Sequence, residues 1–213
     1  MHLNKYIDHT LLHPTATLAD FEELCQEAIK HRFYAVCIPP SYLPVAKSVL
    51  RDSDVKIATV IGFPLGSMST EAKVFEAKDA VAKGADEIDM VLNIGKLKSW
   101  ETDYVEKEIT KIKRTIDSKV LKVIIETCYL TDSEKEAACL AALNAKADFV
   151  KTSTGFGPSG ATFEDIKLIK KIVGNMLQIK ASGGIKDRVS AIKYIELGVS
   201  RLGTSSGIKL VTR

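Results

Sequence analysis

Five charged side chains interrupt short segments that are otherwise apolar and rich in β-branched residues. They are Asp8, Asp89, Lys122, Lys151 and Lys180. Alternate residues of a β-strand point to the same face, so each charged residue shares a face with the residues two positions away. The five faces are Tyr6, Asp8 and Thr10; Glu87, Asp89 and Val91; Lys122, Ile124 and Glu126; Phe149, Lys151 and Ser153; and Gln178, Lys180 and Ser182. If these faces point toward one interior, three ammonium and two carboxylate groups form a single cluster.

A charged residue near a strand end can also reach solvent, and for any one of the five that is an equal alternative. The five positions share a register, however, and lie toward the later part of their segments. The catalytic face of a barrel of parallel strands lies at that end. The shared register therefore favours a functional site.

Such a cluster suits Schiff-base chemistry. A lysine that is crowded by other lysines and partly withdrawn from water should have a lowered pKa. From an ordinary value near 10.4, a fall of about 3 units raises the neutral fraction at neutral pH about a thousandfold. A neutral amine can attack a carbonyl carbon. An adjacent carboxylate such as Asp89 can then move the protons that imine formation, enamine formation and hydrolysis require.

Glycine-rich turns follow the last two of these segments, at Ser182-Gly183-Gly184 and at Gly203-Thr204-Ser205-Ser206-Gly207. Barrels often bind phosphate with the loops after strands seven and eight, where backbone N–H groups and hydroxyls surround the dianion. Either turn alone is more often only a tight turn, but their joint placement favours phosphate binding. Gly155 and Gly157, which follow Lys151, either line a substrate cleft or form a turn.

Eight strands and several helices are predicted to position these residues. The strand segments are 6–12, 34–38, 56–63, 87–93, 121–127, 149–153, 178–182 and 201–204. Helical periodicity predicts helices over 18–30, 70–83, 132–145 and 163–173, and the residues that precede them are Thr17, Ser69, Thr131 and Thr162. Hydroxyl caps followed by acidic first turns are typical of helix starts.

The alternation of strand and helix implies parallel strands joined by right-handed crossovers, and eight such units close into a (β/α)8 barrel. The alternative, an open doubly wound sheet, usually has a G-x-G-x-x-G turn after its first strand. None follows the segment 6–12. We therefore expect one barrel domain over residues 1–213.

Composition excludes several other classes of protein. The 30 basic and 27 acidic residues are interspersed and form no basic stripe, so we do not expect a nucleic-acid partner. The chain shows no signal-peptide segment and no apolar run of membrane-spanning length, which predicts a cytoplasmic protein without a membrane partner. The cysteines, Cys25, Cys37, Cys128 and Cys139, form no C-x-x-C pair. This favours reduced thiols over a disulfide framework or a zinc site.

Seven sequence stretches together resemble the deoxyribose-phosphate aldolase family, and the resemblance covers nearly the whole chain. They are Ile7-Asp8-His9-Thr10-Leu11-Leu12, Ala35-Val36-Cys37-Ile38-Pro39, Val60-Ile61-Gly62-Phe63-Pro64, Glu87-Ile88-Asp89-Met90-Val91, Lys122-Val123-Ile124-Ile125-Glu126-Thr127, Val150-Lys151-Thr152-Ser153-Thr154-Gly155-Phe156 and Lys180-Ala181-Ser182-Gly183-Gly184. The resemblance implies reversible cleavage of 2-deoxy-D-ribose 5-phosphate to D-glyceraldehyde 3-phosphate and acetaldehyde, in deoxynucleoside catabolism.

The resemblance also implies a role for individual residues. Lys151 forms the Schiff base, Lys180 perturbs it and shares proton transfer, and Asp89 is the acid/base carboxylate. Asp8 and Lys122 have supporting roles in the network. The residues expected to bind substrate or phosphate are Thr152, Gly155, Gly183, Gly184, Gly203, Thr204, Ser205 and Ser206. The family further implies no cofactor, no metal, a cytoplasmic location and a homodimer or homotetramer.

Three other functions remain open. A metal-dependent aldolase would need a ligand cluster, and the histidines, His2, His9, His13 and His31, all lie near the amino terminus. Another class I aldolase could use the same lysine on a different substrate, but only the favoured reaction yields acetaldehyde. A non-catalytic phosphate-binding barrel would have no need for three inward lysines.

Overall fold

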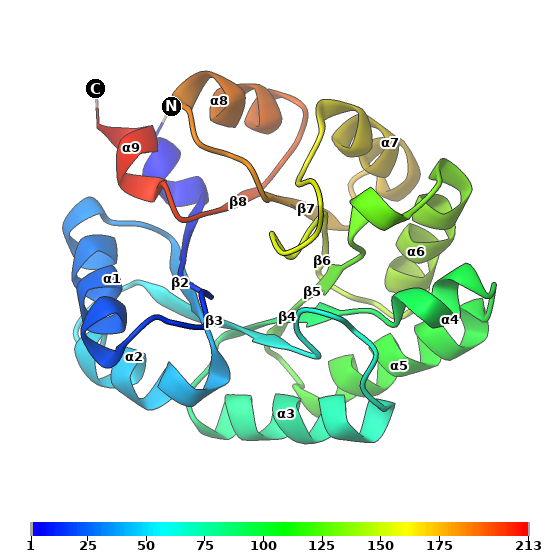
Figure 1. Cartoon of the computed structure of the whole chain (residues 1–213), viewed down its shortest axis with the longest axis horizontal. Helices are drawn as coiled ribbons and strands as arrows, with labels where there is room; N and C mark the ends of the chain where they lie inside the picture. Colours follow the sequence, from blue (N-terminus) through cyan, green and yellow to red (C-terminus); the bar gives the residue numbers. More distant parts are fainter. Residues whose placement is uncertain (1, 213) are drawn as a thin grey trace.

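The computed structural model describes residues 2–212 and shows a closed barrel of eight parallel strands (Figure 1). Each strand pairs with the next, and β8 pairs with β1 to close the barrel. The strands are β1 (Ile7–Thr10), β2 (Ala35–Ile38), β3 (Lys56–Ile61), β4 (Glu87–Val91), β5 (Val120–Ile124), β6 (Phe149–Lys151), β7 (Gln178–Ser182) and β8 (Arg201–Thr204). The predicted (β/α)8 fold is confirmed.

Helices surround the barrel as an outer ring (Figure 1). They are α1 (Leu18–His31), α2 (Leu43–Val49), α3 (Thr70–Ala82), α4 (Ile94–Lys98), α5 (Thr102–Thr115), α6 (Asp132–Asn144), α7 (Phe163–Val173), α8 (Arg188–Glu196) and α9 (Gly207–Val211). Short 3-10 helices span Leu3–Tyr6, Pro40–Tyr42 and Thr127–Tyr129. No helix within residues 2–212 is both long and apolar enough to cross a membrane.

The four helix starts expected from the sequence are confirmed. Thr17 and Thr131 each form a capping box, with Asp20 and Glu134 respectively. Ser69 and Thr162 accept hydrogen bonds from backbone N–H groups in the first turns of α3 and α7. A hydroxyl at this position satisfies an N–H group that has no partner inside the helix, which explains why the signal was readable.

Five strands end two or three residues earlier than the sequence suggested, namely β1, β3, β4, β5 and β6. The predicted ends were wrong because apolar residues such as Leu11, Leu92 and Ile125 continue past the last paired strand residues, where their N–H groups still bond to the neighbouring chain segment. The chain then turns away from the barrel, as at Gly62 and Glu126, whose φ angles are 60° and 52°. These extra residues form the loops at the carboxyl end of the barrel, above the charged cluster.

Strand register places the charged residues in one interior. Lys122 lies opposite Asp89 between β4 and β5, and Lys180 lies opposite Lys151 between β6 and β7. Arg201 in turn lies opposite Lys180. Residues opposite one another in a parallel sheet point to the same face, so these side chains share the barrel lumen. The main apolar core packs the outside of the barrel against the helices.

A buried ion pair lies outside the barrel, between α3 and α5. Nζ of Lys73 is 2.9 Å from Oε2 of Glu108, and both side chains are fully buried. Removing one partner of such a pair leaves an uncompensated buried charge. We expect Glu108→Ala to lower the free energy of unfolding by about 3–5 kcal/mol in urea titrations. The exposed Glu71, paired with Lys111, is the matched control, and equal losses in both variants would contradict the expectation.

Candidate active site

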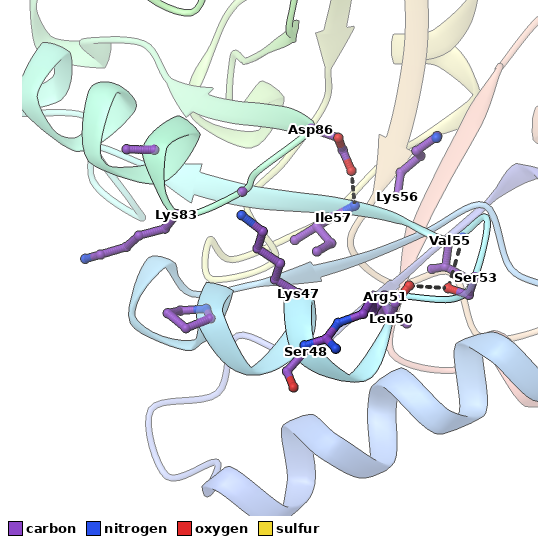
Figure 2. A pocket seen from close by; sticks show the side chains of 13 residues that line it. Lys47, Ser48, Leu50, Arg51, Ser53, Val55, Lys56, Ile57, Lys83 and Asp86 are labelled. Carbon is purple, nitrogen blue, oxygen red and sulfur yellow. Dashed lines mark hydrogen bonds between the residues drawn. The ribbon is translucent and has the colours of Figure 1, made fainter.

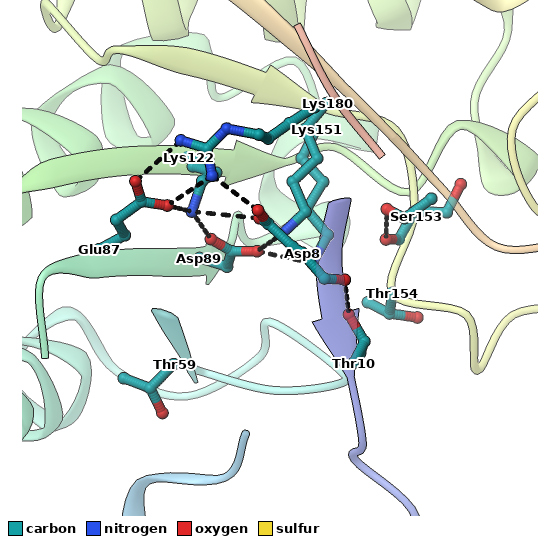
Figure 3. Close-up of polar contacts among 12 residues, drawn as sticks. Asp8, Thr10, Thr59, Glu87, Asp89, Lys122, Lys151, Ser153, Thr154 and Lys180 are labelled. Atoms are coloured by element: carbon teal, nitrogen blue, oxygen red, sulfur yellow. Dashed lines mark hydrogen bonds and ion pairs between the residues drawn. The ribbon is translucent and has the colours of Figure 1, made fainter. Parts of the chain in front are cut away.

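Asp89 on β4 accepts hydrogen bonds from three lysines inside the barrel (Figure 3). Its Oδ2 atom lies 2.8 Å from Nζ of Lys151 and 2.8 Å from Nζ of Lys180. Its Oδ1 atom lies 2.7 Å from Nζ of Lys122. None of these side chains is more than 3% exposed. The structure therefore brings together the three lysines and the carboxylate that the sequence placed on inward faces.

A deeper layer of charges lies below these lysines. Asp8 accepts a hydrogen bond from Lys180, and its Oδ1 atom lies 2.6 Å from Nη1 of Arg201. Nη2 of Arg201 lies 2.9 Å from Oε1 of Glu87, whose Oε2 atom is 2.6 Å from Nζ of Lys122. The network thus extends from β8 through β1 and β4 to β5.

Sequence reasoning left two members out of this network. Glu87 was placed on the same face as Asp89 but was not counted in the cluster, and Arg201 was not considered. The sequence contains a signal for both residues, because each is an ionisable residue at the start of a predicted strand. Arg201 begins the predicted strand 201–204, and its ionisable side chain stands opposite Lys180 once the register is known.

The two aspartates remain ionised despite complete burial. Burial alone would raise the pKa of Asp8, but Lys180, Arg201 and Lys122 outweigh it and lower the pKa to about 2. Burial likewise opposes ionisation of Asp89, yet the three lysines around it hold its pKa well below the ordinary value. Both carboxylates are therefore anionic acceptors at neutral pH.

Lys180 and Lys122 stay protonated for the complementary reason. Burial alone would lower the pKa of Lys180, but Asp8 and Asp89 outweigh it and raise the pKa above its ordinary value. For Lys122 burial is again the largest opposing effect, and its nearby carboxylates, Asp89 foremost, leave its pKa raised as well. Crowding by lysines therefore does not lower the pKa of every lysine here, because the carboxylates lie between them. Lys180 is a fixed positive charge near Lys151.

Glu126 stabilises the loop that follows Lys151. Its buried carboxylate accepts hydrogen bonds from the backbone N–H of Thr154, at 3.2 Å, and from the Thr154 hydroxyl. The Thr154 hydroxyl in turn accepts from the backbone N–H of Phe156 at 3.0 Å. Sequence analysis placed Glu126 on the Lys122 face but gave it no function. These bonds hold the β6–α7 loop against the end of β5.

A cavity of about 600 Å³ opens at the carboxyl ends of β1, β6, β7 and β8. Lys151 lines it, whereas Lys180, Lys122 and Asp89 lie beneath it. Six of the predicted substrate-binding residues also line it, namely Gly155, Gly183, Gly184, Gly203, Thr204 and Ser205. Gly203 must be small, because a Cβ atom there would lie 3.0 Å from Cε of Lys180.

Two predicted substrate-binding residues do not line this cavity. Thr152 is fully buried, and its hydroxyl donates to the Ser182 carbonyl oxygen while accepting from the Ser182 N–H. Ser206 precedes α9, and its N–H donates to the Thr204 hydroxyl. Both residues therefore hold the loops together. The sequence missed Lys186, an exposed cation in the lining two residues after Gly184.

A second cavity, of about 640 Å³, lies at the opposite end of the barrel, by the amino ends of β3 and β4 (Figure 2). Lys47 and Lys83 lie there near the carboxyl ends of α2 and α3, whose partial negative charge favours cations. None of the lysines of the barrel interior lines this cavity. The charged interior therefore opens to the carboxyl-end cavity.

Two of the histidines, His9 and His13, are engaged in local contacts. Nε2 of His9 lies 2.7 Å from Oε2 of Glu27, and Nδ1 of His13 lies 2.8 Å from the Thr15 hydroxyl. Among residues 2–212, no three His, Cys, Asp or Glu side chains are placed to hold a metal ion. The cysteines of this part of the chain are unpaired.

Comparison with known proteins agrees with this arrangement. Residues 3–205 match the family described as DeoC/LacD family aldolase. A deoxyribose-phosphate aldolase from Finegoldia magna is 56% identical over 211 residues, which cover 99% of both chains. One from Thermoanaerobacter is 54% identical and is covered to 96% of its length. The solved structure of a tetrameric deoxyribose phosphate aldolase from Aeropyrum pernix has a TM-score of 0.89 at 31% identity, covering 98% of this chain and 88% of its own.

Proposed function

The chain belongs to the DeoC/LacD family of aldolases, and we propose that it cleaves 2-deoxy-D-ribose 5-phosphate through a Schiff base on Lys151. The products are D-glyceraldehyde 3-phosphate and acetaldehyde, and the reaction is reversible. The observation that carries the proposal is the position of Lys151. Of the three lysines around Asp89, it is the one that lines the cavity, so its amine meets a substrate carbonyl.

The chemistry follows from that position. The Lys151 amine adds to the aldehyde carbon of the open-chain sugar, and loss of water leaves a protonated imine. Removal of the C3 hydroxyl proton breaks the C2–C3 bond, releases glyceraldehyde 3-phosphate and leaves an enamine of acetaldehyde. Protonation of the enamine carbon and hydrolysis then free acetaldehyde and the amine. Asp89 contacts both Lys151 and Lys180, and we assign the proton transfers to Asp89 and Lys180.

We assign the phosphate to the glycine turns after β7 and β8. Gly183, Gly184, Lys186 and Ser205 all line the cavity, so backbone N–H groups, a hydroxyl and an ammonium group are available there to bind a phosphate. A phosphate held there would direct the sugar carbonyl toward Lys151. Asp8 and Lys122 keep their supporting assignment, because they contact the catalytic groups and not the cavity.

Borohydride trapping tests the function directly. The protein is incubated with 2-deoxyribose 5-phosphate and borohydride, with and without a chelator, and the modified peptide is mapped. We expect a chelator-insensitive adduct on Lys151 and formation of acetaldehyde. An adduct without acetaldehyde would indicate another class I aldolase. A folded protein with no adduct would favour a metal-dependent enzyme or a non-catalytic phosphate-binding barrel.

Removing the cation at the proposed phosphate region should change KM for the phosphorylated substrate only. We expect Lys186→Met to raise KM for 2-deoxyribose 5-phosphate about tenfold, because a charge-assisted contact is lost. Ser205→Ala should act in the same direction with a smaller effect. KM for unphosphorylated 2-deoxyribose should not change in either variant. Ser206→Ala is the matched control, since Ser206 does not line the cavity. Equal effects on both substrates would show that the phosphate lies elsewhere.

We further propose that the barrel over residues 1–213 acts as one catalytic domain and assembles as a homodimer or homotetramer in the cytoplasm. The tetramer described for the relative from Aeropyrum pernix supports the assembly. Large apolar side chains such as Phe75 and Trp100, which are 73% and 59% exposed, offer contact area. Light scattering coupled to size-exclusion chromatography measures the assembly.

A further inference from the structure

The buried network has an uneven number of charges. Its cations are Lys122, Lys151, Lys180 and Arg201, and its anions are Asp8, Glu87 and Asp89. With every group ionised, four positive charges meet three negative charges, and one positive charge is uncompensated. A surplus charge is costly in a dry interior, so the network favours loss of one proton.

The three lysines differ in how many carboxylates surround them. Lys122 lies within 4 Å of three carboxylates, those of Asp8, Glu87 and Asp89. Lys180 contacts the carboxylates of Asp8 and Asp89. Lys151 contacts Asp89 alone and borders the cavity. Of the three lysines, Lys151 therefore has the fewest carboxylate partners and is the one that borders the cavity.

Arg201 supplies the fourth positive charge and cannot give it up. A guanidinium group stays charged at all physiological pH values. The side chain is held in place on both sides: its carbon Cζ lies 3.4 Å from the centre of the Tyr34 ring, and its nitrogens contact Asp8 and Glu87. Neither Arg201 nor Glu87 lines the cavity. Their contacts are with the network and not with a bound substrate.

We propose that Arg201 and Glu87 are positioning residues that set the charge balance of the network around Asp89, and through it the pH dependence of imine formation. The inference rests on the proposed Schiff-base function. Arg201 adds a positive charge to the network and Glu87 adds a negative charge, so the two residues have opposite effects. The sequence signal for both is an ionisable residue at the start of a barrel strand.

Other groups that face the network add no further charge to its ion pairs. β2 contributes Cys37, and burial raises the pKa of its thiol, so that it is neutral. β3 contributes the apolar Ala58 and Val60, which pack with Cys37. The remaining strands contribute the seven charged residues already named. Beyond β5, the buried carboxylate of Glu126 is held by Thr154 and forms no ion pair with the lysines or with Arg201. The ion pairs of the network are therefore set by those seven side chains.

The test uses two substitutions for which a charge-balance role predicts shifts of the pH profile in opposite directions. Arg201→Met leaves three positive and three negative charges, so protons are retained and the acid limb of imine formation should move to higher pH. Glu87→Gln leaves four positive and two negative charges, so the same limb should move to lower pH. A unit charge roughly 10 Å away at an effective dielectric constant of ~20 shifts a titration by about one pH unit. The measurement is the rate of the borohydride-trapped Lys151 adduct as a function of pH.

Three companion measurements separate charge balance from structural support. The double variant Arg201→Met/Glu87→Gln again has one surplus positive charge, so its profile should return toward that of the native protein. Arg201→Lys keeps the charge and should also keep the native profile. KM for the substrate should change little in all variants, since neither residue lines the cavity.

The outcomes are distinct. Opposite shifts in the single variants, with return in the double variant, support the proposal. Shifts in the same direction, or a loss of amplitude without a shift, overturn it. Should Arg201→Met fail to fold, the isosteric Glu87→Gln decides alone, because an unshifted profile there overturns the proposal. No adduct in the native protein would instead mean that the proposed function is wrong.

Discussion

Replacing Lys151 by leucine should lower turnover by at least about ten thousandfold, because the covalent step loses its nucleophile. Leucine leaves Asp89 with Lys122 and Lys180 as partners, so the barrel interior keeps its main ion pairs. The fold should therefore persist. Steady-state kinetics measure the turnover, and circular dichroism measures the fold. Borohydride trapping measures the adduct, which should disappear.

Two further variants sharpen this prediction. Lys151→Arg keeps the positive charge but cannot form a Schiff base, so it should be as inactive as the leucine variant. Lys167→Leu, at an exposed lysine of α7, is the matched surface control and should keep native turnover. Near-native activity in either Lys151 variant would show that another group is the nucleophile. A residual adduct mapped to Lys180 would point to the same conclusion.

Asp89→Asn should be the second most damaging change, because three buried lysines lose their shared anionic acceptor. An amide can neither take up a proton nor balance the lysine charges. We expect kcat to fall about a hundredfold to ten thousandfold, which is the range for loss of a positioned acid or base. Loss of the central carboxylate should also lower the free energy of unfolding by about 3–5 kcal/mol.

Kinetics and stability must be measured together for this variant. Single-turnover trapping reports imine formation, while acetaldehyde release reports the complete reaction, so the two assays show which step is slowed. Asp79→Asn, in the exposed i,i+4 pair with Lys83, is the control for a change of aspartate to asparagine and should alter neither activity nor stability. Native kcat in a stably folded Asp89→Asn protein would remove Asp89 from the mechanism.

The role of Lys180 differs in one respect from the sequence-based expectation. Crowding by other lysines was expected to lower lysine pKa values, yet Asp8 and Asp89 hold Lys180 as an ammonium group and raise its pKa. Its proton stays bound through neutral pH and into the alkaline range. An ammonium group beside Asp89 can both add positive charge near Lys151 and donate a proton or a hydrogen bond during catalysis. These effects require the carboxylates as much as the lysines.

The cavity divides the predicted substrate-binding residues into those that line it and those that lie behind its wall. Thr152 was assigned from the resemblance to the family, and Ser206 from the glycine-rich turn after the eighth strand. In the structure Thr152 bonds to the backbone of Ser182, and the N–H of Ser206 bonds to Thr204. Neighbouring residues of an extended chain point to opposite sides, so adjacency in sequence does not give adjacency in the site.

By itself, the sequence determined the fold class, the helix starts and the inward faces of five charged residues. Each of these depends on local rules: hydroxyl caps satisfy the first N–H groups of a helix, and side chains alternate along a strand. Asp8, Asp89, Lys122, Lys151 and Lys180 were identified in this way, and all five lie in the barrel interior. The strand ends were less certain, because apolar residues continue into the loops above the site.

Only the tertiary structure decided which charges meet and which lysine reaches the cavity. Asp8 and Lys180 are 172 residues apart and touch because closure of the barrel brings β1 beside β8 and β8 beside β7. Arg201 and Glu87 join the network through register between strands, which local periodicity does not specify. The depth of a side chain along the barrel axis likewise depends on how each strand is staggered against its neighbours. That stagger places Lys151 at the floor of the cavity and leaves Lys122 and Lys180 beneath it.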